Sequence, residues 1–239
     1  MHEATAPRRQ DAKTAQRLSS RASAQMLGGV LAGPLFVTSF TAIGAARRDY
    51  DWRRYPVSSL AIGPHGWQQR LNFILTGVLY SCAAVALGRS DRRRIGPRAV
   101  PVLSAAAGIG LIGSGVFVTD YVGDPLSGEP DPTRRNSADA AAPVRTRVGQ
   151  IHDLCGIPVF AGIPLAGLAS AATAVRSGDC RWACYSAASS MVMTGSLVVF
   201  GATIKGRPGF RGNSGVLQRI AIAIGLGWLS ALSFRALSQ

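Results

Sequence analysis

The chain has 239 residues, of which 47% are hydrophobic and 16% charged, and its formal net charge is +14. The charged fraction lies well below the roughly 25% of soluble domains, which argues against an ordinary water-soluble enzyme. Plentiful apolar residues exclude intrinsic disorder, and glycines without a three-residue period exclude a collagen-like chain. In a membrane protein, an excess of basic residues indicates contact with anionic lipid and control of topology.

Residues 1–25 are polar and rich in Arg, Ala and Ser, and we expect them to form a flexible basic tail. Six apolar stretches follow, each bounded by charge. The first five contain no Asp, Glu, Lys or Arg, and the sixth carries Arg219 and Arg235 near its ends, where long side chains reach the interface. The stretches cover residues 26–46, 71–88, 99–118, 154–175, 182–204 and 216–237.

Helices of this length cover the roughly 30 Å hydrocarbon core at ~1.5 Å per residue. We therefore predict an all-α fold, a six-helix transmembrane bundle over residues 26–239. Between the first two spans, Pro56 opens a segment that contains Ser58 and Ser59 and lies between Trp52 and Trp67. Proline is suited to a first helical turn, so the segment predicts a short interfacial helix that ends at Gly63-Pro64.

An even number of spans places both termini on one side of the membrane. Basic residues are equally frequent on the two sides, so their total does not decide the orientation. The short loop over residues 89–98 decides it, because it holds five Arg against one Asp and short loops carry most weight in the positive-inside rule. We predict a multi-pass protein of the cytoplasmic (inner) membrane with both termini in the cytoplasm. The basic tail and this loop are expected to contact anionic lipid headgroups, and no aromatic interleaving supports nucleic acid.

Unusual polar residues gather at the ends of the spans on the opposite, outer face. The candidate ligand-binding residues are Arg47, Ser58, Gln69, Asn72, Asp120, His152, Asp153 and Arg219. One interpretation is that Asp120 forms interhelical ion pairs with the cations at matching depth, which are Arg47, Arg70, Lys205 and Arg219. In the other interpretation these residues line one pocket, with Asp120 and His152 as candidate catalytic groups, because imidazole beside carboxylate exchanges protons near neutral pH. In that pocket Arg47, Arg70 and Arg219 would hold negative charge.

No metal site and no cofactor are expected. The four cysteines form no C-x-x-C pair and are accompanied by no ladder of histidines, so they do not predict zinc. The segment Gly108-Ile-Gly110-Leu-Ile-Gly113 matches a dinucleotide-binding fingerprint, but it lies inside an apolar span with no strand before it. Its glycines more naturally form a helix-packing face.

Several of these polar segments occur together in a recognisable order. They are Arg47 to Asp51, Tyr55-Pro-Val-Ser-Ser-Leu-Ala, Gly66-Trp67 with Gln69 and Asn72-Phe73, Phe117-Val-Thr-Asp120, Gly149-x-x-His152-Asp153, and Gly215-Val-Leu-Gln-Arg219. From about Leu27 to Leu237 the chain resembles the prokaryotic membrane family called domain of unknown function 998. The resemblance implies a six-helix membrane protein and draws attention to the outer-face residues, but it implies no reaction. Gln218 stands where an acid is often seen.

The leading functional hypothesis is the binding of a small polar molecule or lipid headgroup at the outer end, with a link to transport. No acid lies deep in any span, which counts against proton-coupled transport. The first alternative is a membrane-embedded enzyme that acts on a lipid or isoprenoid. The second is a structural or sensory subunit, and the sequence leaves homo- and hetero-oligomers open.

Overall fold

The computed structural model describes residues 9–48, 50–120, 145–204 and 213–238, and all regular structure in these ranges is helical. Six helical segments are long and apolar enough to cross a membrane, which confirms the predicted spans to within a few residues, except that the first and the fourth begin earlier, at Ser19 and Arg147. The elements in chain order are α1 (Arg9–Ala46), η1 (Val57–Ala61), α2 (Trp67–Leu87), α3 (Arg92–Ile95), α4 (Ala99–Val116), α5 (Arg147–Ile157), η2 (Pro158–Gly162), α6 (Ile163–Arg176), α7 (Cys180–Ile204) and α8 (Ser214–Leu237).

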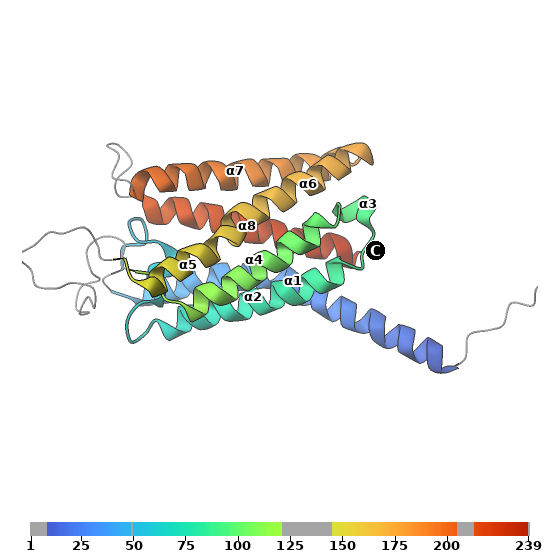
Figure 1. Ribbon diagram of the computed structural model, residues 1–239, viewed down its shortest axis with the longest axis horizontal. Coiled ribbons are helices and arrows are strands. Elements are labelled where there is room, and N and C mark those ends of the chain that lie inside the picture. The colour runs from blue at the N-terminus through green and yellow to red at the C-terminus, as the bar shows by residue number, and fades with distance from the viewer. Residues whose placement is uncertain (1–8, 49, 121–144, 205–212, 239) are drawn as a thin grey trace, which may run out of the picture.

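The six spans form a closed ring. Going round it, α1 packs on α2, α2 on α4, α4 on α5 and α6, α6 on α7, α7 on α8, and α8 returns to α1. Figure 1 shows the spans side by side, with α3 and the C-terminus at one end, which we call the terminal end. The start of α1 lies at the same end, as six spans require. We call the opposite end, which carries η1, the η1 end.

Helix α1 is longer than the apolar stretch that predicted it. It begins at Arg9, so much of the expected flexible tail over residues 1–25 is helical instead. Residues 9–26 contain no Gly or Pro and several Ala, Gln and Arg, which are good helix formers, so the helix continues outward from its membrane span. In Figure 1 this first part of α1 projects beyond the other helices at the terminal end.

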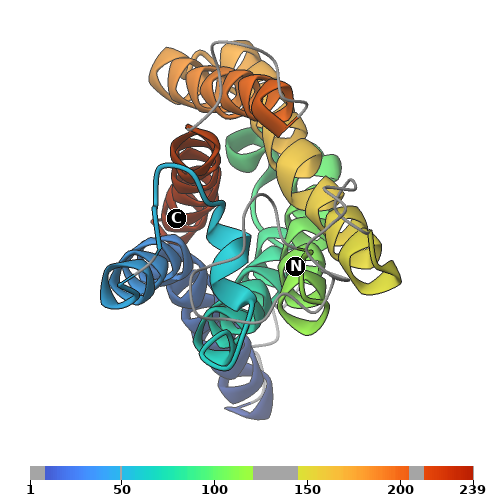
Figure 2. The same cartoon turned by 90° about the vertical axis from the view of Figure 1, so that its left-hand side faces the viewer.

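The predicted short helix between the first two spans is confirmed as the 3₁₀ helix η1, but it is not on the surface. All five of its residues are buried, and Figure 2 shows it inside the ring at the η1 end. Val57, Leu60 and Ala61 lie on either side of two serines and give the segment enough apolar surface to be buried among the spans. Gly66 then lets the chain turn sharply into α2, because a side chain there would collide with the backbone of Ala61.

The fourth span is bent by a π-helical turn. Pro164 has no backbone N–H, and its ring would meet the carbonyl of Phe160 in a regular α-helix. The wider turn of η2, over Pro158–Gly162, accommodates this conflict. As a result α5 packs on α4, whereas α6 packs on α7, and the first half of this span separates from α7.

The glycines of the fingerprint-like segment in α4 form a packing face, as expected. A side chain at Gly108 would collide with the backbone of Gly77 and the hydroxyl of Ser81 in α2. Side chains at Gly110 and Gly113 would collide with Cys155 in α5. Small residues let the helix backbones approach closely, which drives association in lipid through dispersion.

Candidate functional site

Side chains from the surrounding spans hold both ends of η1. Arg47, directly after α1, donates from Nη2 to the carbonyl oxygen of Leu60 over 3.0 Å, and more weakly to that of Ile62. At the other end, the backbone N–H of Val57 donates to Oε1 of Gln218 over 2.6 Å. A buried short helix leaves backbone groups without helical partners, and these contacts satisfy several of them.

Arg219 fastens the chain before η1 to the start of α8. Its guanidinium donates to the hydroxyl of Tyr50 and to the carbonyl oxygens of Trp52, Tyr55 and Gly215. It also lies over the Tyr50 ring, 5.4 Å from the centroid. The donors of Arg219 are therefore engaged with loop carbonyls rather than free for a ligand.

Tyr50 completes this attachment. Burial raises the pKa of its phenol, although the neighbouring Arg219 acts in the opposite direction. The hydroxyl therefore stays protonated and lies 3.1 Å and 3.0 Å from the carbonyl oxygens of Tyr55 and Pro56, to which it donates.

Arg70 plays a similar part at the end of α4, where its side chain donates to the carbonyl oxygens of Gly115 and Val116. The arginines that the sequence assigned to anion binding, Arg47, Arg70 and Arg219, thus all donate to backbone carbonyls. These contacts give no support to an anion site built from them.

Asp120 begins the chain's return to α5. Its carboxylate accepts hydrogen bonds from the backbone N–H of Thr146 over 2.9 Å and from the Thr146 hydroxyl over 2.6 Å. Thr146 in turn caps α5 by accepting from the N–H of Gly149. The part of the chain that the structure describes shows no ion pair of Asp120, and Lys205, one of its expected partners, lies outside those residues.

Gln69 and Asn72 lie buried between α1 and α2 near the η1 end. The Asn72 amide donates to the carbonyl of Phe36 over 3.1 Å and to Oε1 of Gln69 over 3.3 Å. The Nε2 atom of Gln69 is buried without a hydrogen-bond partner. Asn72 links α2 to α1, Gln69 bonds to Asn72 within α2, and neither residue lines the cavity described below.

His152 has one ring nitrogen engaged. Nδ1 lies 2.8 Å from the carbonyl oxygen of Phe117. A carbonyl can only accept, so Nδ1 carries the proton, and in the neutral ring Nε2 presents a lone pair. The ring is buried and packs edge-on against Phe73.

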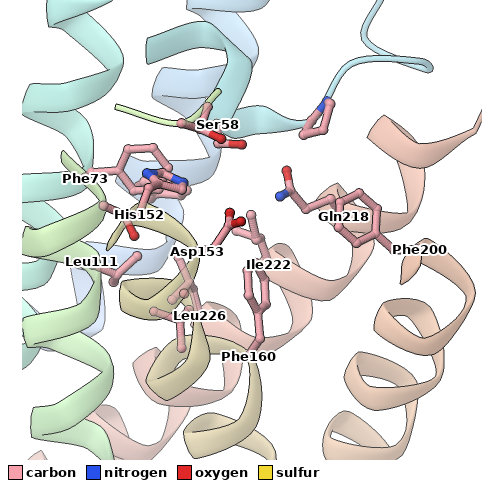
Figure 3. A pocket seen from close by; sticks show the side chains of 16 residues that line it. Ser58, Phe73, Leu111, His152, Asp153, Phe160, Phe200, Gln218, Ile222 and Leu226 are labelled. Carbon is pink, nitrogen blue, oxygen red and sulfur yellow. The ribbon is translucent and has the colours of Figure 1, made fainter. Parts of the chain in front are cut away.

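A cavity of about 220 Å³ lies beside His152, among η1, α4, α5–η2, α7 and α8. It lies where the first half of the bent fourth span separates from α7. Most of its wall is apolar, formed by Phe36, Pro56, Phe73, Leu111, Gly156, Val159, Phe160, Phe200, Ile222 and Leu226. The polar lining residues are Ser58, Ser114, Thr119, His152, Asp153 and Gln218. Figure 3 shows Ser58, His152, Asp153 and Gln218 toward one end of the cavity, and Phe160 and Leu226 toward the other.

The polar groups around the cavity keep hydrogen-bonding capacity. The hydroxyls of Ser58 and Ser114 make no hydrogen bond in the described part of the chain. Gln218 uses its oxygen on Val57, which leaves its NH₂ group directed to the cavity (Figure 3). Asp153 lies 3.6 Å from Arg145 in an exposed ion pair, a weak contact that solvent screens.

Of the predicted site residues, the structure brings Ser58, His152 and Asp153 together around the cavity. It leaves Arg47, Gln69, Asn72, Asp120 and Arg219 in separate contacts, so the expected pair of Asp120 and His152 does not face one pocket. Sequence reasoning missed Gln218 and Ser114. The sequence drew attention to Gln218 only through its place at the start of a span and the family resemblance, and nothing in it distinguished Ser114 from the other hydroxyls within the spans.

Comparison with curated proteins and with solved structures finds no match to this chain. A family model matches residues 30–235, which include all six spans, η1 and the cavity. The segments that carried the sequence resemblance are those that hold η1 in the ring and form the wall beside His152. The chain belongs to the family described as protein of unknown function, DUF998.

Proposed function

We propose that this membrane protein binds a lipid-like amphipathic molecule in the cavity at the η1 end. The observation that carries the proposal is a mainly apolar cavity whose polar side chains gather at one end with unused hydrogen-bonding capacity. Pockets for small molecules combine apolar walls with a few polar groups that fix orientation. A ligand with a polar head and an apolar chain satisfies both parts of this lining.

The position of the cavity supports a ligand that enters from the bilayer. It lies where α5 and η2 separate from α7, and these elements carry exposed apolar side chains such as Leu154, Ile157 and Val198. The volume of about 220 Å³ is below the roughly 300–1,000 Å³ of most ligand pockets. The cavity therefore holds the head and the first part of a chain, and the rest of the ligand extends into lipid.

The packing of the terminal half of the ring favours a role in ligand binding over transport of the ligand through the bundle. There Tyr80 donates to the carbonyl of Leu226 over 2.7 Å, and Ser230 donates to the carbonyl of Gly29 over 3.0 Å. These contacts fill the space between α1, α2 and α8. A transport route would have to break them.

The proposal places the protein in the cytoplasmic membrane with the terminal end on the cytoplasmic side. Arg92, Arg93 and Arg94 of α3 are exposed there, as is Arg98 before α4. Clusters of this kind attract anionic lipid headgroups by about 1 kcal/mol per charge. This orientation puts the cavity at the outer leaflet.

Lipid mass spectrometry on purified protein tests the proposal. Gly156 lines the cavity, and a side chain there would first meet only ordinary contacts with Phe160. Gly156→Leu should fill the cavity and remove a lipid that co-purifies with the wild type. Gly195→Leu is the matched control, because Gly195 lies on α7 with open space around it. Identical lipid content in all three proteins would contradict the proposal.

A second candidate function is acid–base catalysis on the bound lipid. It is favoured by the tautomer of His152, whose contact with the Phe117 carbonyl leaves Nε2 as a proton acceptor beside the cavity. The two functions differ in what happens to the ligand. A co-purifying lipid that is chemically converted by wild type but not by His152→Asn would establish the enzyme.

A further inference from the structure

The hydrogen-bonding direction of two cavity groups is fixed by their neighbours. Oε1 of Gln218 accepts from the backbone N–H of Val57 over 2.6 Å, and an N–H must meet an oxygen. The amide NH₂ is therefore the part that Gln218 directs to the cavity (Figure 3). It can only donate.

His152 offers the opposite capacity. Its Nδ1–H is held by the carbonyl of Phe117, so Nε2 of the neutral ring can only accept. The cavity therefore presents one fixed donor and one fixed acceptor. Ser58 and Ser114 add hydroxyls that can do either.

The charges near the cavity do not select an ion. Arg47 and Arg219 direct their N–H groups to backbone carbonyls, so no described arginine lines the cavity to hold a phosphate or carboxylate. Asp153 is the lining group with a negative charge, and Arg145 lies 3.6 Å from it. Because this carboxylate is exposed, solvent and Arg145 together screen its charge, and its attraction for a cation in the cavity is weak.

We infer that the ligand's head is an uncharged alcohol, whose O–H donates to Nε2 of His152 and whose oxygen accepts from the NH₂ of Gln218. The inference rests on the proposed function and names the ligand class. A hydroxyl both donates and accepts, so its hydrogen-bonding capacity matches the acceptor of His152 and the donor of Gln218. An ammonium head has no lone pair for the Gln218 amide, and a phosphate head meets the lone pair of His152 and the carboxylate of Asp153.

Three probes with the same chain and different heads test this inference on the full-length protein. Delipidated wild type is incubated with equal concentrations of dodecanol, dodecylamine and dodecyl phosphate, and native mass spectrometry measures how much of each remains bound. We expect dodecanol to be favoured by about 10-fold, which corresponds to one well-made hydrogen bond. Preferential retention of the amine or the phosphate by wild type would overturn the inference.

Two nearly isosteric variants identify the groups responsible. The amide nitrogen of Asn lies near the position of Nδ1, so His152→Asn can keep the contact with Phe117 while it removes Nε2. It should lower dodecanol binding about 10-fold and leave the other probes unchanged. Gln218→Glu keeps an oxygen for Val57 but replaces the donor by a carboxylate, so it should shift the preference to dodecylamine.

Gln68→Glu is the control for the added charge, because Gln68 is exposed at the start of α2 and does not line the cavity. It should keep the preference of the wild type. Dodecanol binding that is unaffected by both His152→Asn and Gln218→Glu would overturn the inference. If Gly156→Leu also bound every probe as the wild type does, the proposed function would be contradicted as well. If Gly156→Leu lost the probes while His152→Asn and Gln218→Glu bound dodecanol normally, the proposed function would stand, and the ligand would have a head other than an alcohol.

Discussion

In the terminal half of the ring, several polar side chains inside the bundle bond to neighbouring helices, although Oε1 of Gln25 and Oγ of Ser81 are buried there without a partner, whereas around the cavity at the η1 end unpartnered hydroxyls line a hollow. Ser230 lies 3.0 Å from the hydroxyl of Tyr80 and accepts from the N–H of Gly33, and Trp228 donates to Ser186 over 3.0 Å. Around the cavity, Ser58 and Ser114 have no such partners. A hydroxyl that faces a cavity and has no partner in the protein remains able to bond to a bound molecule, which is consistent with the proposed ligand.

The difference has a geometric origin. Glycines in α1 let α8 approach closely, so hydroxyls in the terminal half reach backbone groups of the next helix. At the η1 end, the π-helical turn directs α5 away from α7, and η1 fills only part of the resulting space. Similar residue types therefore hold helices together in one half and line a hollow in the other.

The largest effect is expected where the terminal half has no space. A side chain on Gly33 would lie 2.7 Å from the Ser230 hydroxyl and 2.8 Å from the Leu226 carbonyl. Gly33→Leu should lower the free energy of unfolding by about 3 kcal/mol or more through overpacking and lost hydrogen bonds. Unfolding in mixed micelles measures it, with Gly195→Leu as the control. Equal stability of the two variants would remove the distinction between a tight half and a hollow half.

A smaller effect is expected from releasing the loop before η1. Arg219→Met removes the donors to two loop carbonyls and to the Tyr50 hydroxyl, at a cost of about 2 kcal/mol. Hydrogen exchange of residues 50–61 should then become roughly 30-fold faster, since opening of this segment needs less free energy. Arg219→Lys should restore only part of the protection, because a point charge lacks the guanidinium's planar set of donors. Full protection in the Met variant would show that packing alone holds η1.

The smallest effect concerns the terminal end and depends on pH. The backbone N–H of Trp182, followed by the Arg235 side chain 2.7 Å away, lowers the pKa of Asp179. A carboxyl whose pKa is lower in the folded than in the unfolded protein stabilises the folded state at pH values above the unfolded pKa. This contribution is lost as the pH falls below about 4.

Asp179→Asn should therefore be less stable than wild type near neutral pH by less than about 1 kcal/mol, because the pair is partly exposed. Thermal unfolding as a function of pH should show the two proteins converging in acid. A stability difference that persists unchanged at low pH would mean that Asp179 acts through its shape rather than its charge.

Much of the fold follows from apolar patterning. Uninterrupted stretches such as Ala99 to Val118 predict spans because backbone polar groups in lipid must be satisfied within a helix. The glycines at 108, 110 and 113 were predictable as a packing face because small residues within a span let neighbouring helices approach closely. The start of α1 was not, because composition alone does not distinguish a polar helix that extends a span from a polar tail.

The site was less predictable than the fold. The polar residues at one end of the spans include some that anchor loops and others that line a cavity, and the sequence does not separate the two groups. In the structure, Asp120 and Arg219 anchor loops. His152 was correctly placed at the η1 end, but its partner is a backbone carbonyl, which no side-chain pattern reveals.

The sequence by itself determined six membrane spans with both termini at one end, because hydrophobicity and helix length act locally along the chain. It also placed Ser58, His152 and Asp153 among the polar residues at one end of the spans. Only the tertiary structure decided which polar residues line the cavity, because the bend at η2, the burial of η1 and the direction of each hydrogen bond depend on neighbours distant in the chain.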